Sequence, residues 1–117
     1  MPPEARTTLD DQVAALRAFR DERDWSRFHT PKDLACAISV EAAELLDAFR
    51  WSGPDTGVAG REDEVREELA DVMIYCLYLA DAIGEDPAAL IADKLALNEG
   101  HYPADKSRGS AAKYTEL

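Results

Sequence analysis

Apolar side chains recur every three or four positions in four separate stretches of this sequence, which is the spacing of one helix face. The pattern predicts helices over residues 8–23, 30–51, 61–84 and 86–100. Capping, first-turn and helix-ending residues mark several of these boundaries: Thr8, Thr30-Pro31, Gly84, Asp86-Pro87 and Gly100. Strand-like alternation is missing from the pattern, so we expect an all-α, four-helix bundle-like fold.

The third predicted helix begins with charged residues and continues with apolar ones. From Val72 onward it is almost wholly apolar, and a helix of this kind must be surrounded by other elements. We therefore expect it at the centre of the fold. Glu64, Glu68, Asp71 and Tyr75 form a strip beside its buried stripe. Because an unpaired buried carboxylate is costly, this strip needs a partner, and a bound cation is the simplest one.

The chain of 117 residues is long enough for one domain and too short for two. We expect a single domain over 1–117, whose ends at 1–7 and 104–117 are flexible or packed in an oligomer. The apolar helix surfaces exceed what four helices of this length bury alone, which predicts a homo-oligomer. No run approaches the ~18 apolar residues of a membrane span, and no signal-peptide pattern is present, so a cytoplasmic protein is expected.

The net charge of −11, from 13 basic and 24 acidic side chains, argues against nucleic acid or an anionic membrane as a partner. A chain this acidic can bind an anionic small substrate only where a metal ion or a nearby lysine makes the local electrostatic potential positive. Cys36 and Cys76 lie inside predicted helices without a CxxC pair. We expect buried free thiols there, with neither a zinc site nor a disulfide.

Two pairs of acids stand out, Glu41 with Glu44 and Glu68 with Asp71. The i, i+3 spacing places each pair on one helix face, and packed helices lie ~8–10 Å apart, so facing pairs can converge. Oxygen ligands without histidine or thiolate favour Mg²⁺ or Mn²⁺, whereas a di-iron bundle would supply Glu-x-x-His motifs. Solvated faces of acidic helices carry such pairs too. The mid-stripe position of Glu41 favours the metal site.

The connector at residues 23–31 concentrates Trp25, Phe28 and His29. Large aromatic side chains in a loop either plug the core or offer a platform on which a planar ligand stacks. The residues alone leave both interpretations open.

Together these segments resemble the MazG-like, all-α nucleoside triphosphate pyrophosphohydrolases, and most closely the dCTP pyrophosphatase branch. The resemblance covers roughly residues 8–117. The acid pairs carry it together with further segments in order: Arg23-Asp-Trp25, Phe28-His29-x-Pro31, Phe49-x-Trp51, Glu67-Glu68-Leu-x-Asp71-Val-x-Ile74-Tyr75, Lys94 with Asn98, Tyr102-Pro103 and Lys113-Tyr-Thr-Glu-Leu117.

The resemblance implies a MazG-type fold and a Mg²⁺-dependent enzyme, with Mn²⁺ as a substitute. It would hydrolyse a deoxynucleoside triphosphate, favoured as dCTP or a 5-modified dCTP, to the monophosphate and pyrophosphate, and so clean the nucleotide pool. The implied metal-binding and catalytic residues are Glu41, Glu44, Glu68 and Asp71, with Glu41 expected to accept a proton from the attacking water. The implied substrate contacts are Trp25, Phe28, His29, Trp51 and Tyr75 for base and sugar, and Lys94, Asn98 and Tyr102 for the phosphates. The implied assembly is a dimer or a tetramer of two dimers.

Three departures from the family pattern bear on the preferred base more than on the reaction. Leu16 stands where close relatives carry a histidine, the connector at 52–60 is shorter, and Glu99-Gly100-His101 replaces a basic run. The alternatives within the enzyme class are a dUTP or general dNTP pyrophosphatase and a phosphoribosyl-ATP pyrophosphohydrolase. The alternative outside it is an acidic helical module that binds a protein partner through exposed aromatic side chains.

Overall fold

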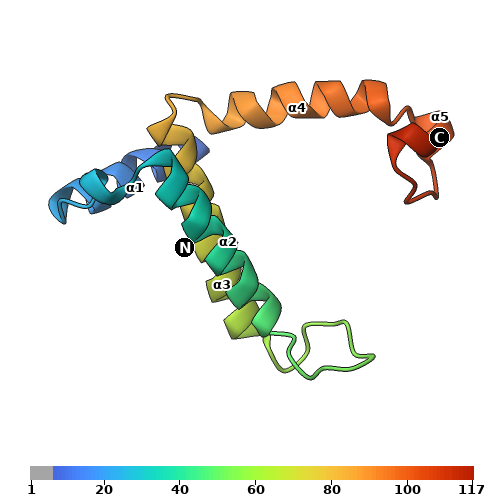
Figure 1. Ribbon diagram of the computed structural model, residues 1–117, viewed down its shortest axis with the longest axis horizontal. Helices are drawn as coiled ribbons and strands as arrows, with labels where there is room; N and C mark the ends of the chain where they lie inside the picture. The colour runs from blue at the N-terminus through green and yellow to red at the C-terminus, as the bar shows by residue number, and fades with distance from the viewer. Residues whose placement is uncertain (1–6) are drawn as a thin grey trace, which may run out of the picture. The chain divides into compact units, whose positions relative to one another are not determined.

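The computed structural model describes residues 7–117, and within that range its regular elements are all helical (Figure 1). The all-α fold class is therefore confirmed. The elements, in order, are α1 (Leu9–Glu22), the 3₁₀ turn η1 (Ser26–Phe28), α2 (Pro31–Asp47), α3 (Glu62–Ala82), α4 (Pro87–His101), α5 (Ala104–Ser107) and the 3₁₀ turn η2 (Tyr114–Glu116).

The predicted helix starts are confirmed by their caps. Thr8 and Asp11 form a reciprocal capping box, in which each side chain accepts a hydrogen bond from the other residue's backbone N–H, at 3.1 and 3.0 Å. Thr30 and Asp86 cap α2 and α4 and precede a proline in each first turn.

The end of α2 differs from the prediction, because the helix stops at Asp47 rather than near Trp51. The backbone N–H groups of Ala48, Phe49 and Arg50 each donate to the carbonyl three residues earlier. This tighter i→i−3 pattern is typical of a fraying last turn. Sequence periodicity does not separate such a turn from the helix before it.

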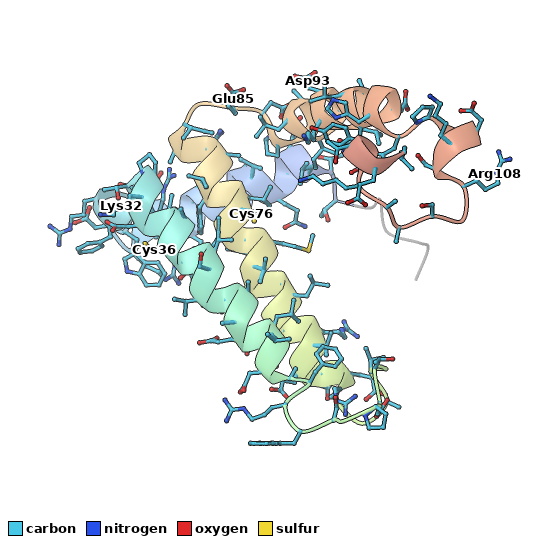
Figure 2. The ribbon with its side chains drawn as sticks, turned by 45° about the vertical axis from the view of Figure 1, so that its right-hand side comes forward. Lys32, Cys36, Cys76, Glu85, Asp93 and Arg108 are labelled. Carbon is cyan, nitrogen blue, oxygen red and sulfur yellow. The ribbon has the colours of Figure 1, made fainter. Side chains whose placement is uncertain are left out.

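The chain divides into two compact units, one ending at Gly84 and the other running from Glu85 to Leu117. In the first unit α2 and α3 lie side by side along their lengths, and α1 also packs on α3 (Figures 1 and 2). α3 therefore contacts both other helices of this unit as predicted, but it is not surrounded, because Leu69, Met73 and the C-cap residue Ile83 remain exposed. Leu34, at 1% exposed, and the buried Ala48, Tyr78 and Ala80 fill the contacts.

In the second unit the chain after α4 folds back on the end of that helix. The ring of Tyr114 stacks on His101 at 4.0 Å between centroids, with a 10° interplanar angle, and meets Tyr102 edge-on at 5.8 Å. The predicted C-terminal tail therefore contains α5 and η2, whereas residues 1–6 of the predicted N-terminal tail lie outside the described range. Over residues 7–117, no helix combines the length and the apolar character needed to cross a membrane.

The prediction that the two cysteines are buried is wrong, because both are exposed (Figure 2). Cys36 lies on α2 and Cys76 on α3, and two helices packed side by side bury only the seam between them. The outer faces also leave large apolar side chains in water, as the 57% exposure of Met73 illustrates.

An ion-pair network that the sequence did not reveal fastens α1 to α3. Arg17 Nε donates to Asp81 Oδ1 at 2.6 Å, and a terminal guanidinium nitrogen of Arg20 donates to Asp81 Oδ2 at 2.8 Å. Beside them the Tyr78 hydroxyl donates to the backbone carbonyl of Leu16 at 2.8 Å. The side chains of Arg20 and Asp81 are only 14% and 15% exposed, so this pair is less screened than a surface pair. Hydrogen bonds from Arg17 and then from Arg20 hold the pKa of Asp81 below its usual value.

We predict that Asp81→Asn destabilises the fold at neutral pH by about 1.5–3 kcal/mol, the scale of hydrogen bonds to a charged group. Because the pKa of Asp81 is lower in the fold, its contribution exists above the unfolded pKa and is lost as pH falls through the folded value. Urea unfolding at pH 7 and at pH 3 measures this. The gap between wild type and variant should shrink at pH 3, and Asp93→Asn, an exposed acid on α4, serves as the control. An equal gap at both pH values would contradict the prediction.

Candidate metal centre and neighbouring cavity

Three carboxylates meet between α2 and α3. Glu41 and Glu44 project from α2 and Glu68 from α3, and one oxygen from each lies within 4.8 Å of the others. The i, i+3 spacing on α2 produces this, because it directs both glutamates at the neighbouring helix. Asp71, the fourth predicted ligand, follows Glu68 by one turn, and its charge reaches Glu41.

The electrostatics of this cluster favour a cation. Burial raises the pKa of Glu41 from its ordinary value of 4.5 to about 7, with further contributions from Glu44, Asp71 and Glu68. Burial, followed by the charge of Glu44, also raises the pKa of Glu68. The Oε2 atoms of Glu41 and Glu68 are buried and lack a hydrogen-bond partner among the described residues. Two orphaned carboxylate oxygens beside a third carboxylate match the oxygen ligands that a hard divalent cation requires.

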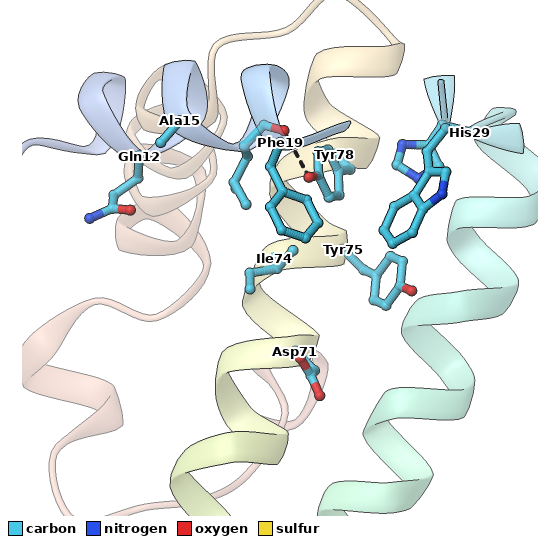
Figure 3. A pocket seen from close by; sticks show the side chains of 10 residues that line it. Gln12, Ala15, Phe19, His29, Asp71, Ile74, Tyr75 and Tyr78 are labelled. Carbon is cyan, nitrogen blue, oxygen red and sulfur yellow. Dashed lines mark hydrogen bonds between the residues drawn. The ribbon is translucent and has the colours of Figure 1, made fainter. Parts of the chain in front are cut away.

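A cavity of about 390 Å³ lies beside the cluster, between α1 and α3 (Figure 3). Its walls include Gln12, Leu16 and Phe19 from α1 and Asp71, Ile74 and Tyr75 from α3. The volume falls within the ~300–1,000 Å³ of small-molecule sites. Asp71 links the cavity to the carboxylate cluster, because its side chain lines this wall and its charge helps to raise the pKa of Glu41.

The aromatic connector lines this cavity and a second hollow of about 330 Å³ on its α2 side. Trp25, His29 and Tyr75 belong to both walls, and Phe28 joins them in the second. Trp25 packs edge-on against Phe19 at 5.7 Å. At 44% exposed it remains open to solvent. This exposure favours the platform interpretation over a plug.

His29 packs against Tyr78 at 4.7 Å between ring centroids. Its Nδ1 atom is buried without a hydrogen-bond partner in the described part of the chain. Burial and then the charge of Arg20 lower the pKa of His29, so the imidazole is neutral near pH 7. A neutral ring suits stacking and hydrogen bonding with an uncharged group.

The MazG-like family model matches residues 36–117. Over 115 residues the chain is 37% identical to dCTP pyrophosphatase 1 of Rattus norvegicus, covering 94% of this chain and 68% of that protein. The same enzyme of Homo sapiens is 36% identical with the same coverage. The chain belongs to the MazG-like family. A crystal structure of a pyrophosphatase from Archaeoglobus fulgidus superposes on this MazG-like chain with a TM-score of 0.77 and 38% identity, covering 88% of this chain and 99% of the other.

Within this MazG-like chain Trp51 lines neither cavity. It lies in the loop after α2, is 93% exposed and has a positive φ of 63°. The loop is braced internally, since Asp55 accepts a hydrogen bond from the Gly57 backbone at 3.0 Å and the Arg61 guanidinium donates to the Gly57 carbonyl. A role of Trp51 in substrate binding stays a prediction.

The three residues expected near the phosphates belong to the second unit. Lys94 and Asn98 line a shallow hollow on α4, and Tyr102 follows the end of that helix. Their role stays a prediction.

Sequence reasoning missed part of the α1 wall. Gln12 and Phe19 lie at i and i+7 around Leu16, so the spacing itself could have placed them on one face. A competing stripe of apolar residues at i, i+4 and i+7 runs through Leu9, Val13 and Leu16. Val13 is buried, and the two stripes are adjacent on the helix. In the sequence, Tyr78 is surrounded by apolar residues, and no motif or spacing distinguishes it as a cavity residue.

We predict that metal-free wild-type protein loses thermal stability between pH 5 and pH 8, and that Glu41→Gln removes most of this loss. The pKa of Glu41 is about 7 in the fold against an ordinary 4.5. The folded chain therefore keeps a proton that the unfolded chain has released, and this stabilisation is lost as pH rises through about 7. Melting curves in EDTA across this range test it.

The control is Glu67→Gln on α3, outside the cluster, which should keep the wild-type slope. A Glu41→Gln variant that loses stability as steeply as wild type would show that the pH dependence arises elsewhere.

Proposed function

We propose that this MazG-like chain hydrolyses a deoxynucleoside triphosphate, preferably dCTP or a 5-modified dCTP, to the monophosphate and pyrophosphate with Mg²⁺. The observation that carries the proposal is the Glu41, Glu44 and Glu68 cluster, whose two orphaned oxygens lie beside an aromatic cavity that shares Asp71. One side of this site suits a metal-bound phosphate chain and the other a planar base.

The enzyme class is confirmed by the relatives. These are the dCTP pyrophosphatases and a nucleoside triphosphate pyrophosphohydrolase of Mycolicibacterium smegmatis, which is 34% identical over 84 residues, or 72% of this chain and 23% of that protein. The preferred base and the identity of the ion belong to the proposal. Nucleotide-pool cleaning in the cytoplasm is the role that such a reaction would serve.

Glu41, Glu44, Glu68 and Asp71 would hold the ion, with Mn²⁺ as a substitute for Mg²⁺. A bound ion supplies the positive charge that offsets the phosphate oxygens, which a chain with a net charge of −11 otherwise lacks. Glu41 is the proposed proton acceptor for the attacking water, because its raised pKa lies near the working pH.

The cavity would hold the nucleoside. Trp25, His29 and Tyr75 offer rings against which a base can stack, and every base presents a π face to such rings. Phe28 closes the α2 side. Trp51 is proposed to contact the base or sugar as well, and Lys94, Asn98 and Tyr102 the phosphates.

Self-association is also proposed, as a homodimer or homotetramer. Large apolar side chains remain exposed on three helices, including Leu46 at 72%, Met73 at 57% and Ile91 at 65%. Apolar surface left in water on this scale marks an interaction site.

We predict that Glu41→Gln or Asp71→Asn lowers Mg²⁺-dependent pyrophosphate release by about 100-fold or more. Mutation of a residue that merely supports a metal ligand already lowers activity by up to about 100-fold, and these two residues are proposed to be ligands themselves. Helical content by circular dichroism should stay unchanged. Glu67→Gln, which keeps the cluster intact, should retain activity. Full activity in either cluster variant would contradict the metal assignment.

We predict that dCTP is hydrolysed fastest in a screen of the eight common nucleoside triphosphates with pyrophosphate detection. The same screen also includes dUTP and phosphoribosyl-ATP. A faster reaction with dUTP, with all deoxynucleotides alike, or with phosphoribosyl-ATP would replace the dCTP preference with the corresponding alternative.

We predict that Mg²⁺ with a non-hydrolysable dCTP analogue raises the melting temperature. At a ligand concentration of 100 times Kd, binding stabilises a fold by about 2.7 kcal/mol. The Asp71→Asn variant provides the control and should show a smaller rise. No rise in wild type would favour the acidic module that binds a protein partner instead.

A further inference from the structure

One wall of the cavity carries an uncharged hydrogen-bonding side chain, Gln12 on α1 (Figure 3). Its cavity neighbours on that helix are Ala15, Leu16 and Phe19, which offer no side-chain hydrogen bond. The hydroxyl hydrogen of Tyr78 is already donated to the Leu16 carbonyl at 2.8 Å. On this side of the cavity, Gln12 is therefore the side chain placed to form a hydrogen bond with a polar group of a ligand.

The amide of Gln12 is hydrogen-bonded to Thr7. Its Nε2 atom donates to the Thr7 hydroxyl at 2.8 Å. Figure 3 shows the amide nitrogen turned away from the Phe19 and Ile74 side chains and the oxygen turned toward them. The carboxamide thus presents an acceptor to the cavity.

The cavity is long enough to bring a base to this acceptor. Along α3 its wall extends from Asp71 to Tyr78, which at 1.5 Å per residue is about 10.5 Å. A nucleotide whose phosphates lie at the carboxylate cluster would enter past Asp71. Its sugar and base would then extend along this wall toward α1.

We infer that Gln12 is a specificity-determining residue that accepts a hydrogen bond from the exocyclic amine of the bound base. Cytosine and adenine carry such an amine, whereas uracil and thymine present a carbonyl oxygen at the corresponding edge. An acceptor that faces a carbonyl leaves both oxygens unpaired, and sites built around a hydrogen bond reject partners that cannot make it. The inference rests on the proposed function, since it places the base in this cavity.

The experiment compares kcat/KM for dCTP and dUTP, which differ in the amine and carbonyl at one ring position. For Gln12→Leu, we expect the dCTP value to fall about tenfold more than the dUTP value, mainly through KM; tenfold corresponds to about 1.4 kcal/mol. Thr7→Val releases the amide to turn its nitrogen toward the cavity, so it should shift the ratio in the same direction by a smaller factor.

The matched control is Leu16→Met on the same wall, which alters shape without adding or removing a polar group. It should change both substrates in the same proportion. An unchanged dCTP to dUTP ratio in Gln12→Leu, or a larger loss with dUTP, would overturn the inference while leaving the proposed reaction intact.

Calorimetry with non-hydrolysable dCTP and dUTP analogues separates this inference from the proposed function. A Gln12-dependent preference for the dCTP analogue without any pyrophosphate release would support Gln12 and contradict the reaction. Binding of neither analogue to wild type would overturn both.

Discussion

Mutual repulsion among carboxylates between α2 and α3 is the constraint on which this structure depends. One carboxylate oxygen from each of Glu41, Glu44 and Glu68 lies within 4.8 Å of the others, with Glu41 and Glu68 half-buried and Glu44 exposed. Burial and then the neighbouring carboxylates raise the pKa of Glu41, and a bound cation would favour its charged form. The seam tolerates the cluster because Leu34 and Ala48, toward either end of α2, are buried and hold the helices together.

The cavity depends on a second interaction, the attachment of α1 to α3. Arg17 and Arg20 meet on Asp81, and Tyr78 reaches the backbone at Leu16. These contacts fix the position of α1 along α3. They also position the connector after α1, because the Trp25 backbone N–H donates to the Arg20 carbonyl at 3.1 Å. The ion pair and the aromatic platform are therefore parts of one arrangement.

The two interactions divide the chemistry of the site. In the proposed function, the α2–α3 seam would supply negative charge for a metal ion that binds the phosphate chain, whereas the α1–α3 contact would supply aromatic surface and the Gln12 amide for a base. Asp71 belongs to both. Under this proposal, a substitution on α1 would change the base preference without disturbing the acids on α2 and α3.

The helices, their caps and both acid pairs were predictable from the sequence, because helix periodicity and capping are local properties that a short window of residues determines. The resemblance to the MazG-like family was equally readable from segments in order. Tertiary structure alone decided that Cys36 and Cys76 stay exposed, that the Trp51 side chain is exposed to solvent, and that Asp81 forms ion pairs with α1. It also decided which of two adjacent α1 stripes faces the cavity. Pairings across more than sixty residues depend on which helix faces pack together, and the local pattern of a single helix allows several such choices.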